Sequence, residues 1–209
     1  MKAEKSLKEH VYQSILDGII CDEYKSDEIL TEKALIEKYQ VSKSPIREAL
    51  IALCNEGVLR SIPRCGYEVI RITRENVKEI LKFRSILEKG CMQQYYDSLT
   101  KEQIAELMRY NEPCCDVSAS EDMWKHWEYN EKFHLQLISY ANNSYAYKQL
   151  KESMDILKRA YAQFYWDKWN TTVVSSDIRS PAKLIECLEN RDIEEAMKYL
   201  DLDLEDFGY

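Results

Sequence analysis

DEILTEKALIEKYQVSKSPIREALIALCN, residues 27–55, predicts the architecture of the first part of the chain. A helix is expected to begin after Thr31, because a threonine hydroxyl suits the N-cap position and an apolar period follows it. A second helix is expected to begin at Ser42 or Ser44. Pro45 fits the first turn of that helix, where the amide has no intrahelical partner. The stretch therefore predicts two short helices joined by a tight turn.

The second predicted helix has two chemically different faces. Its apolar face consists of Ile46, Ala49, Leu50 and Leu53. Near its start, the other face carries Lys43, Ser44 and Arg47. Basic and hydroxylic side chains at the N-terminus of such a helix are typical of the helix-turn-helix, which reads the DNA major groove. The same spacing is compatible with an ordinary helical hairpin whose polar face is solvated.

The residues that follow favour the DNA-binding interpretation. Gly57 ends the second helix where a left-handed cap is needed. Two short runs of alternating apolar residues then flank Pro63-Arg64-Cys65-Gly66, a pattern typical of a β-hairpin. A hairpin directly after a recognition helix is a wing, and its basic tip can reach a phosphate or the minor groove.

Residues 7–72 resemble the winged helix of GntR-family transcription regulators. Residues 41–50, VSKSPIREAL, carry the family pattern almost unbroken, with Lys43 where arginine is usual. Gln40 stands where glycine is usual. The resemblance implies a double-stranded DNA operator as partner, and we expect Arg47 to make the principal base contact. The expected DNA-binding residues are Lys33, Ser42, Lys43, Ser44, Pro45, Arg47, Arg64 and Gly66.

Charge is divided unevenly along the 209 residues. The formal net charge is −8, yet residues 1–74 hold 12 Lys/Arg and 12 Asp/Glu. The remaining residues, with 17 basic and 25 acidic side chains, carry the whole excess. The basic residues of the first part are expected to form one basic face. Length and pattern predict two domains, a DNA-binding domain over residues 1–72 and an all-α effector-binding and dimerisation domain over residues 73–209.

The cysteines and the absence of long apolar runs indicate a cellular location. Seven cysteines, an odd number without a C-x-x-C pair, are expected to be thiols in a reducing cytoplasm. A redox role for the adjacent Cys114 and Cys115 is the alternative. The sequence contains no signal-peptide pattern and no long apolar run, so no membrane partner is expected.

Helical periodicity continues through the second half of the chain. The expected helices cover residues 75–96, about 100–113, 120–141, 145–169, 181–188 and 193–207. The short links between them predict an antiparallel six-helix bundle. The predicted fold class is therefore mostly α: a winged helix-turn-helix of three helices plus a small β-hairpin, followed by the bundle.

Four motifs in this half resemble the FCD effector-binding domain of the FadR branch of the GntR family. Two of them are FRSILE at residues 83–88 and NEKFH at residues 130–134. ANNS at residues 141–144 and LIECLENRD at residues 184–192 follow in the family's order. Six helices and a short length resemble the VanR-like subgroup. The resemblance implies a homodimer that binds a small-molecule effector and a near-palindromic operator.

The resemblance also raises the question of a metal. Many FCD domains hold a divalent ion with an aspartate, a histidine one helical turn later and two further histidines. The corresponding positions here are Asn130, His134, Pro181 and Asp203. Proline has no donor atom and asparagine is a neutral, weak ligand. His134 and Asp203 alone are fewer ligands than a zinc site needs, so we expect no metal and no other cofactor.

Arg84 is the expected anchor of an effector. It lies among apolar residues on its helix, and an inward arginine must pair with an acidic group. Either an internal carboxylate, such as that of Glu88 or Asp203, or an acidic group of an effector meets this need. The expected effector is an organic acid, and the expected effector-binding residues are Arg84, Asn130, His134, Tyr165 and Asp203.

We expect a transcription regulator rather than an enzyme. The chain has three histidines and no nucleophile–base pair at a recognisable spacing. The predicted function is that of a cytoplasmic homodimer whose helical domain senses a small metabolite. The alternative is a DNA-binding regulator whose helical domain only dimerises and binds no effector.

Overall fold

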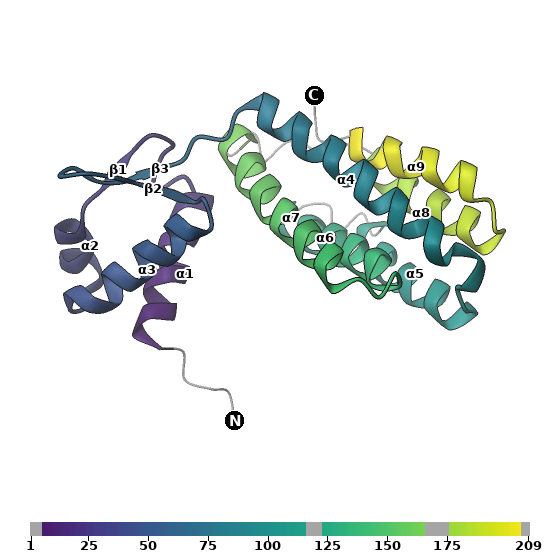
Figure 1. Ribbon diagram of the computed structural model, residues 1–209, viewed down its shortest axis with the longest axis horizontal. Helices are drawn as coiled ribbons and strands as arrows, with labels where there is room; N and C mark the ends of the chain where they lie inside the picture. The colour runs from purple at the N-terminus through teal and green to yellow at the C-terminus, as the bar shows by residue number, and fades with distance from the viewer. Residues whose placement is uncertain (1–5, 116–122, 166–175, 206–209) are drawn as a thin grey trace. The chain divides into compact units, whose positions relative to one another are not determined.

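The computed structural model describes residues 6–115, 123–165 and 176–205 (Figure 1). The chain divides into two compact units, and each has its own hydrophobic core. The first unit comprises Met1–Thr73 together with Arg159–Trp166. The second comprises Arg74–Lys158 together with Asp167–Tyr209.

The helices of the winged-helix part of the first unit are α1 (Leu7–Ile20), α2 (Glu32–Tyr39) and α3 (Lys43–Asn55). The predicted cap of α2 is confirmed, since Thr31 Oγ1 accepts a hydrogen bond from the Ala34 amide at 3.2 Å. Ser42 occupies the N-cap position of α3 but makes no side-chain cap hydrogen bond. Pro45 lies in the first turn of α3, as its missing amide proton predicted.

Residues with positive φ close both α2 and the turn after α3. Gln40, at the position where the GntR pattern usually has glycine, is left-handed with φ of 55°. A side chain makes this conformation less favourable than it is for glycine, so the tight turn forms at a small local cost. Gly57 follows α3 with φ of 63°, which confirms the predicted left-handed end.

A three-stranded antiparallel sheet completes this part of the fold. Its strands are β1 (Ile29–Leu30), β2 (Leu59–Ile62) and β3 (Gly66–Val69), in the order β1-β3-β2. The predicted hairpin is β2-β3, in which Leu59 pairs with Val69 and Ile62 with Gly66. The prediction of a hairpin alone was incomplete, because β1 also pairs with β3. Two residues are too few to show the alternation by which a strand is recognised.

The apolar face of α3 forms the centre of the first core. Ile46, Leu50 and Leu53 are fully buried and pack in one cluster with Val11 and Ile15 of α1. Burying a side chain of this size contributes roughly 1.5–3 kcal/mol. Since one face of α3 is held in this way, its opposite face must point to solvent.

The second unit is helical throughout its described part. The α-helices that begin in it are α4 (Arg74–Tyr95), α5 (Lys101–Cys115), α6 (Met123–Ser139), α7 (Ser144–Tyr165), α8 (Ser176–Glu189) and α9 (Ile193–Glu205). A short 3-10 helix, Tyr96–Ser98, follows α4. These elements confirm the predicted class, a winged helix-turn-helix followed by a helical C-terminal part.

Pro181 does not begin a helix, although the sequence suggested that it does. It lies inside α8, which begins at Ser176. A proline further along a helix removes one backbone hydrogen bond, and here the helix continues through it.

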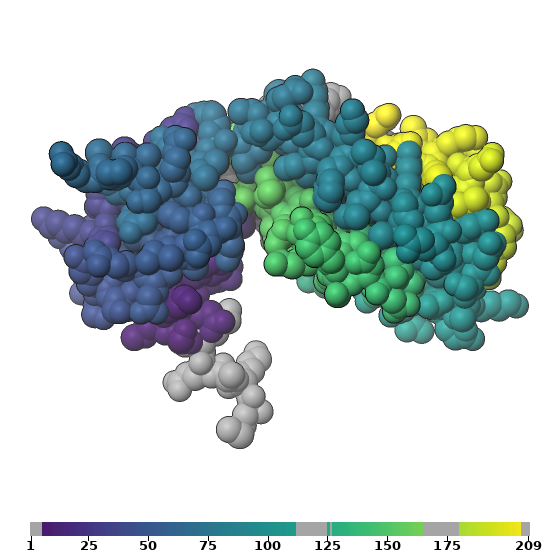
Figure 2. Space-filling view, in the orientation of Figure 1, coloured from purple at the N-terminus to yellow at the C-terminus, as the bar shows by residue number. Residues whose placement is uncertain are grey.

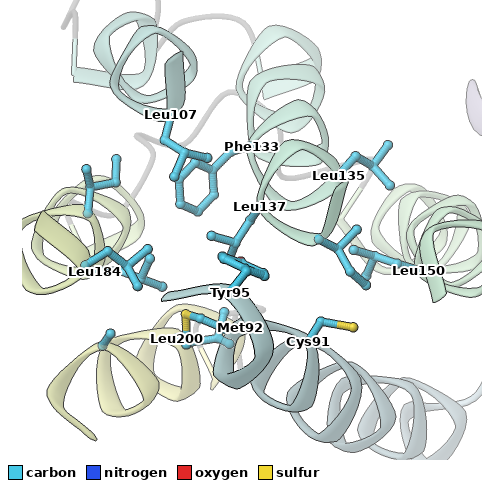
Figure 3. Packing of buried hydrophobic residues seen from close by; sticks show 14 of the residues in the cluster. Cys91, Met92, Tyr95, Leu107, Phe133, Leu135, Leu137, Leu150, Leu184 and Leu200 are labelled. Carbon is cyan, nitrogen blue, oxygen red and sulfur yellow. The ribbon is translucent and has the colours of Figure 1, made fainter. Parts of the chain in front are cut away.

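The core of the second unit is drawn in Figure 3, where side chains from several helices meet. Met92 and Tyr95 of α4 lie against Leu137 of α6, and Leu107 of α5 lies beside Phe133. Leucines of α7, α8 and α9 also belong to the cluster: Leu150, Leu184, Leu188, Leu200 and Leu204.

None of the helices in the described part of the chain has the length and apolar character needed to span a membrane.

Candidate DNA-binding surface and buried polar cluster

The start of α3 presents polar side chains to solvent. Ser42, Lys43, Ser44 and Arg47 are exposed, and Pro45 is half-buried between them. The amide groups of a first helical turn have no intrahelical acceptors and carry partial positive charge. Basic and hydroxylic side chains around such a turn form a surface that suits phosphate groups.

One carboxylate, that of Glu32 at the start of α2, contacts both basic side chains of this turn. Arg47 donates from Nε to Glu32 Oε1 at 2.9 Å and from Nη2 to Oε2 at 3.3 Å. Lys43 Nζ lies 3.2 Å from Glu32 Oε2. The hydrogen bond from Arg47 lowers the pKa of Glu32, with a smaller contribution from Lys43 and a partial offset from burial. Glu32 is therefore an anion at neutral pH.

Two other predicted contacts also have acidic neighbours. Ser44 Oγ donates to Glu48 Oε1 at 2.8 Å. Lys33 Nζ lies 3.9 Å from Glu37 Oε1, and both side chains are largely exposed. Exposed pairs of this kind contribute little to stability, because water competes for both partners. These side chains can therefore exchange their carboxylate partners for DNA at low energetic cost.

The wing tip has a defined backbone conformation. Arg64 is exposed in the turn between β2 and β3 with φ of 65°. Gly66 has φ of 141°, and a Cβ there would lie 2.4 Å from the Leu30 carbonyl oxygen. The glycine is thus required by the pairing of β3 with β1, and its first role is structural. The hairpin projects from the rest of the first unit at the left edge of Figure 2.

A chain of buried charged groups lies within the second unit. Arg84 Nε donates to Glu88 Oε1 at 2.9 Å within α4. His134 of α6 has Nδ1 2.6 Å from Glu88 Oε2 and Nε2 2.8 Å from Asp203 Oδ2 of α9. The side chains of all four residues are 4% exposed or less. We call Arg84, Glu88, His134 and Asp203 the buried polar cluster.

The geometry of the buried polar cluster determines its protonation. With Glu88 and Asp203 ionised, each ring nitrogen of His134 donates a hydrogen bond to a carboxylate oxygen, and the ring is an imidazolium. Burial and the positive charge of Arg84 lower the pKa of His134, but the charge of Glu88 and the hydrogen bonds to Asp203 and Glu88 raise it overall. Burial likewise raises the pKa of Glu88, and the charges of His134 and Arg84 more than reverse this shift. Two cations and two anions then balance.

Comparison with known proteins places both units in one family. The profile described as "Bacterial regulatory proteins, gntR family" matches residues 7–69. The profile described as "FCD domain" matches residues 79–206, more than half of the chain. The chain belongs to the GntR family and carries an FCD domain. It is accordingly a DNA-binding transcription regulator.

Individual relatives agree with this assignment. The chain is 28% identical over 148 residues to an uncharacterized HTH-type transcriptional regulator, YdhC, of Bacillus subtilis, covering 70% of this chain and 66% of that protein. It is 29% identical over 131 residues to the gluconate operon transcriptional repressor of Bacillus licheniformis, covering 63% and 52%. The matches thus span about half to two thirds of these relatives. Both are regulators, as expected, and not enzymes.

A solved structure gives the same fold. E. coli McbR/YncC superposes with a TM-score of 0.76 at 21% sequence identity, covering 96% of this chain and 94% of that one. At this identity, the likeness extends to the fold alone. It agrees with a winged helix-turn-helix followed by a helical domain in GntR-family regulators.

The structure brings together three of the five predicted effector-binding residues, namely Arg84, His134 and Asp203. Asn130 is half-buried on α6, one helical turn before His134. Tyr165 is the last residue of α7, and its side chain lies outside the described residues. Arg84 Nε has the internal partner that the sequence left open as one alternative.

Glu88 was predicted only as a possible internal partner of Arg84 and not as a site residue, although it contacts both Arg84 and His134. Its position four residues after an inward arginine was the available signal, because residues so spaced lie on one helix face. Its contact with His134, 46 residues away, has no signature in the sequence.

The metal site of other FCD domains does not fit the residues found here. Pro181, in α8, has no donor atom, and Asn130 is a neutral ligand. Both ring nitrogens of His134 are within hydrogen-bond distance of carboxylates. Within residues 6–115, 123–165 and 176–205, no group of three His, Cys, Asp or Glu side chains is arranged to hold a metal ion.

Proposed function

We propose that this GntR-family regulator acts in the cytoplasm as a homodimer on a near-palindromic operator. We also propose that a small organic acid bound in the FCD domain changes its operator affinity. The short bundle, with its six α-helices in the described part, supports assignment to the VanR-like subgroup of the FadR branch. Residues 1–72 serve as the DNA-binding domain and residues 73–209 as the effector-binding and dimerisation domain.

On DNA, Arg47 makes the principal base contact. Its guanidinium is exposed at the start of α3, where a recognition helix presents its side chains to the major groove. Lys33, Ser42, Lys43 and Ser44 contact phosphates or bases beside it. Arg64 and Gly66 form the wing tip, and Pro45 fixes the first turn of the helix.

The observation that carries the effector proposal is the incomplete pairing of Arg84. Its Nε is bound by Glu88, but its buried Nη2 has no hydrogen-bond partner among the described residues. A buried donor without a partner costs about 1–3 kcal/mol, more when it is charged. A carboxylate of a ligand would accept from this group, and His134, Asn130, Asp203 and Tyr165 would surround the ligand.

One specific observation favours the alternative, in which the bundle only dimerises. The charges of the buried polar cluster balance without any ligand, since Arg84 and His134 face Glu88 and Asp203. A network whose charges balance internally needs no external anion. Only the Nη2 group of Arg84 argues against this alternative.

A thermal-shift screen of small organic acids separates the two functions. An acid that binds should raise the melting temperature of the wild type by mass action and leave Arg84→Met unchanged. The same acid should change operator affinity, because coupling between two binding sites is reciprocal. A stabilisation equal in both variants would remove Arg84 from the site. No stabilising acid, together with a more stable Arg84→Met variant, would favour the dimerisation-only alternative.

A further inference from the structure

We propose that Glu32 is a specificity-determining residue of the DNA-binding surface: it orients Arg47 for base recognition and weakens binding to random DNA. This inference rests on the proposed base contact of Arg47. The carboxylate of Glu32 binds both cations, Lys43 and Arg47, at the start of α3.

The orientation follows from the hydrogen bonds that Arg47 makes. A guanidinium has five N–H donors in one plane. Nε and one proton of Nη2 are directed to Glu32. The adjacent end of the guanidinium, made by Nη1 and the second proton of Nη2, remains for DNA. Two parallel donors at that end match O6 and N7 of guanine, the commonest specific contact in the major groove.

Glu32 is held firmly enough to act as such a support. It is the first residue of α2, directly after the cap Thr31, and its side chain is 21% exposed compared with 54% for Arg47. A carboxylate at a helix N-terminus is favoured by the helix dipole. A long, exposed arginine on its own samples many rotamers, and its ordering would otherwise oppose binding. The bidentate contact reduces this freedom before DNA arrives.

The negative charge of Glu32 weakens the binding of phosphates, although its orienting effect favours the base contact. Lys43 and Arg47 without Glu32 would present two positive charges to the DNA backbone, whereas with Glu32 the three groups together carry one. Non-specific binding depends on phosphate neutralisation and carries no base information. The carboxylate therefore lowers affinity for every sequence, and its orienting effect compensates only where a guanine is correctly placed.

The test uses the full chain and a duplex selected from a random library by the wild-type protein. Dissociation constants for this duplex and for random duplex are measured over a range of KCl concentrations. The variants are Glu32→Gln, Glu32→Asp and Arg47→Ala, with the double variant Glu32→Gln/Arg47→Ala. Glu23→Gln is the matched control, because Glu23 is an exposed acid of the same unit and its partner, Lys38, is not an expected DNA contact. Circular dichroism and thermal melting verify that each variant folds.

Glu32→Gln should tighten binding to random duplex by about three- to tenfold and steepen its log–log salt dependence by about one unit. The ratio of selected to random affinity should fall by about fivefold or more. Glu32→Asp keeps the charge but shortens the reach. It should leave random binding within about twofold and weaken binding to the selected duplex. In the Arg47→Ala background, Glu32→Gln should no longer change the ratio.

Two outcomes would overturn the inference in distinguishable ways. If Arg47→Ala lowers the ratio but Glu32→Gln changes it no more than Glu23→Gln does, Glu32 has no role in specificity and the base contact of Arg47 stands. If Arg47→Ala itself leaves the ratio unchanged, the proposed base contact fails, and the role of Glu32 fails with it.

Discussion

Two glutamate–arginine pairs in this protein have the same contact distance and different surroundings. Glu32 and Arg47 meet at 2.9 Å at the DNA-binding surface, where their side chains are 21% and 54% exposed. Glu88 and Arg84 also meet at 2.9 Å, but inside the bundle, where 0% and 4% of their side chains are exposed. Both contacts join an arginine Nε to a glutamate oxygen, but the first connects α2 to α3, the second lies within α4, and the two pairs differ strongly in burial.

That difference determines what each pair can do. An exposed pair is worth about 0–1 kcal/mol, because water and salt compete with it, and it is easily exchanged for a phosphate or a base. A buried pair has lost its water, so removal of one partner leaves an uncompensated charge at a cost of about 3–5 kcal/mol. The exposed pair suits reversible recognition, whereas the buried pair lies within α4 and binds His134 of α6 through its glutamate.

The largest difference between the two pairs is expected in the free energy of unfolding when each carboxylate is removed. Glu88→Gln should lower the free energy of unfolding by roughly 3–5 kcal/mol, because Arg84 and the His134 imidazolium both lose their shared anion. The matched change, Glu32→Gln, should alter it by less than about 1 kcal/mol. Urea unfolding followed by circular dichroism measures both. Equal costs for the two variants would mean that burial does not separate the pairs.

Removing Arg47 should affect DNA binding and not stability. Arg47→Ala should weaken binding to a selected operator by about 1–3 kcal/mol and relax its sequence preference, because a base contact is lost. Its effect on unfolding should be small. Lys183→Ala, at an exposed cation paired with Glu186 in the second unit, is the control for charge alone. A loss with Arg47→Ala that is equal on operator and random duplex would assign Arg47 to phosphate only.

The pH dependence of stability should come from the buried polar cluster. The pKa of His134 is raised in the folded state, so its stabilisation is fully present below about pH 6.5 and is lost as pH rises through the folded value. One proton of difference corresponds to a slope of about 1.4 kcal/mol per pH unit. The pKa of Glu88 is lowered in the folded state, so this residue affects stability at acidic pH. Its stabilisation is present above about pH 4.3 and is lost as pH falls through the folded value.

Unfolding of the wild type and of His134→Gln between about pH 6 and pH 9 tests this expectation. The wild type should lose stability with rising pH over this range, and the variant should lack that component. The pairs of the DNA-binding surface contain no histidine, so Glu32→Gln should keep the wild-type profile. Parallel profiles for wild type and His134→Gln would show that the ring does not carry the extra proton.

The smallest effect on stability is expected when a chelator removes any transition metal from the protein. Because the positions corresponding to the family's metal ligands include Asn130 and Pro181, the purified protein should carry no stoichiometric transition metal. A chelator should therefore leave the melting temperature of the bundle unchanged. Elemental analysis that finds about one zinc, nickel or manganese per chain, lost in His134→Ala, would contradict this.

The sequence by itself determined the local structure of the DNA-binding part. The cap at Thr31, the position of Pro45 and the left-handed Gly57 were all predictable, because each depends on residues within one or two turns. The apolar period of α3 likewise specified which face is buried and therefore which side chains remain for DNA. The motifs of the GntR family, each of which is a continuous stretch of sequence, identified the protein as a transcription regulator.

Only the tertiary structure decided which charges meet. Arg47 is 15 residues from Glu32, and His134 is 46 and 69 residues from Glu88 and Asp203. The pairing of β1 with β3 joins segments almost forty residues apart in the same way. Such contacts follow no period and no capping rule, because they depend on how packed helices and strands bring distant side chains together. Burial, which makes one glutamate–arginine pair structural and leaves the other exchangeable, arises only from that packing.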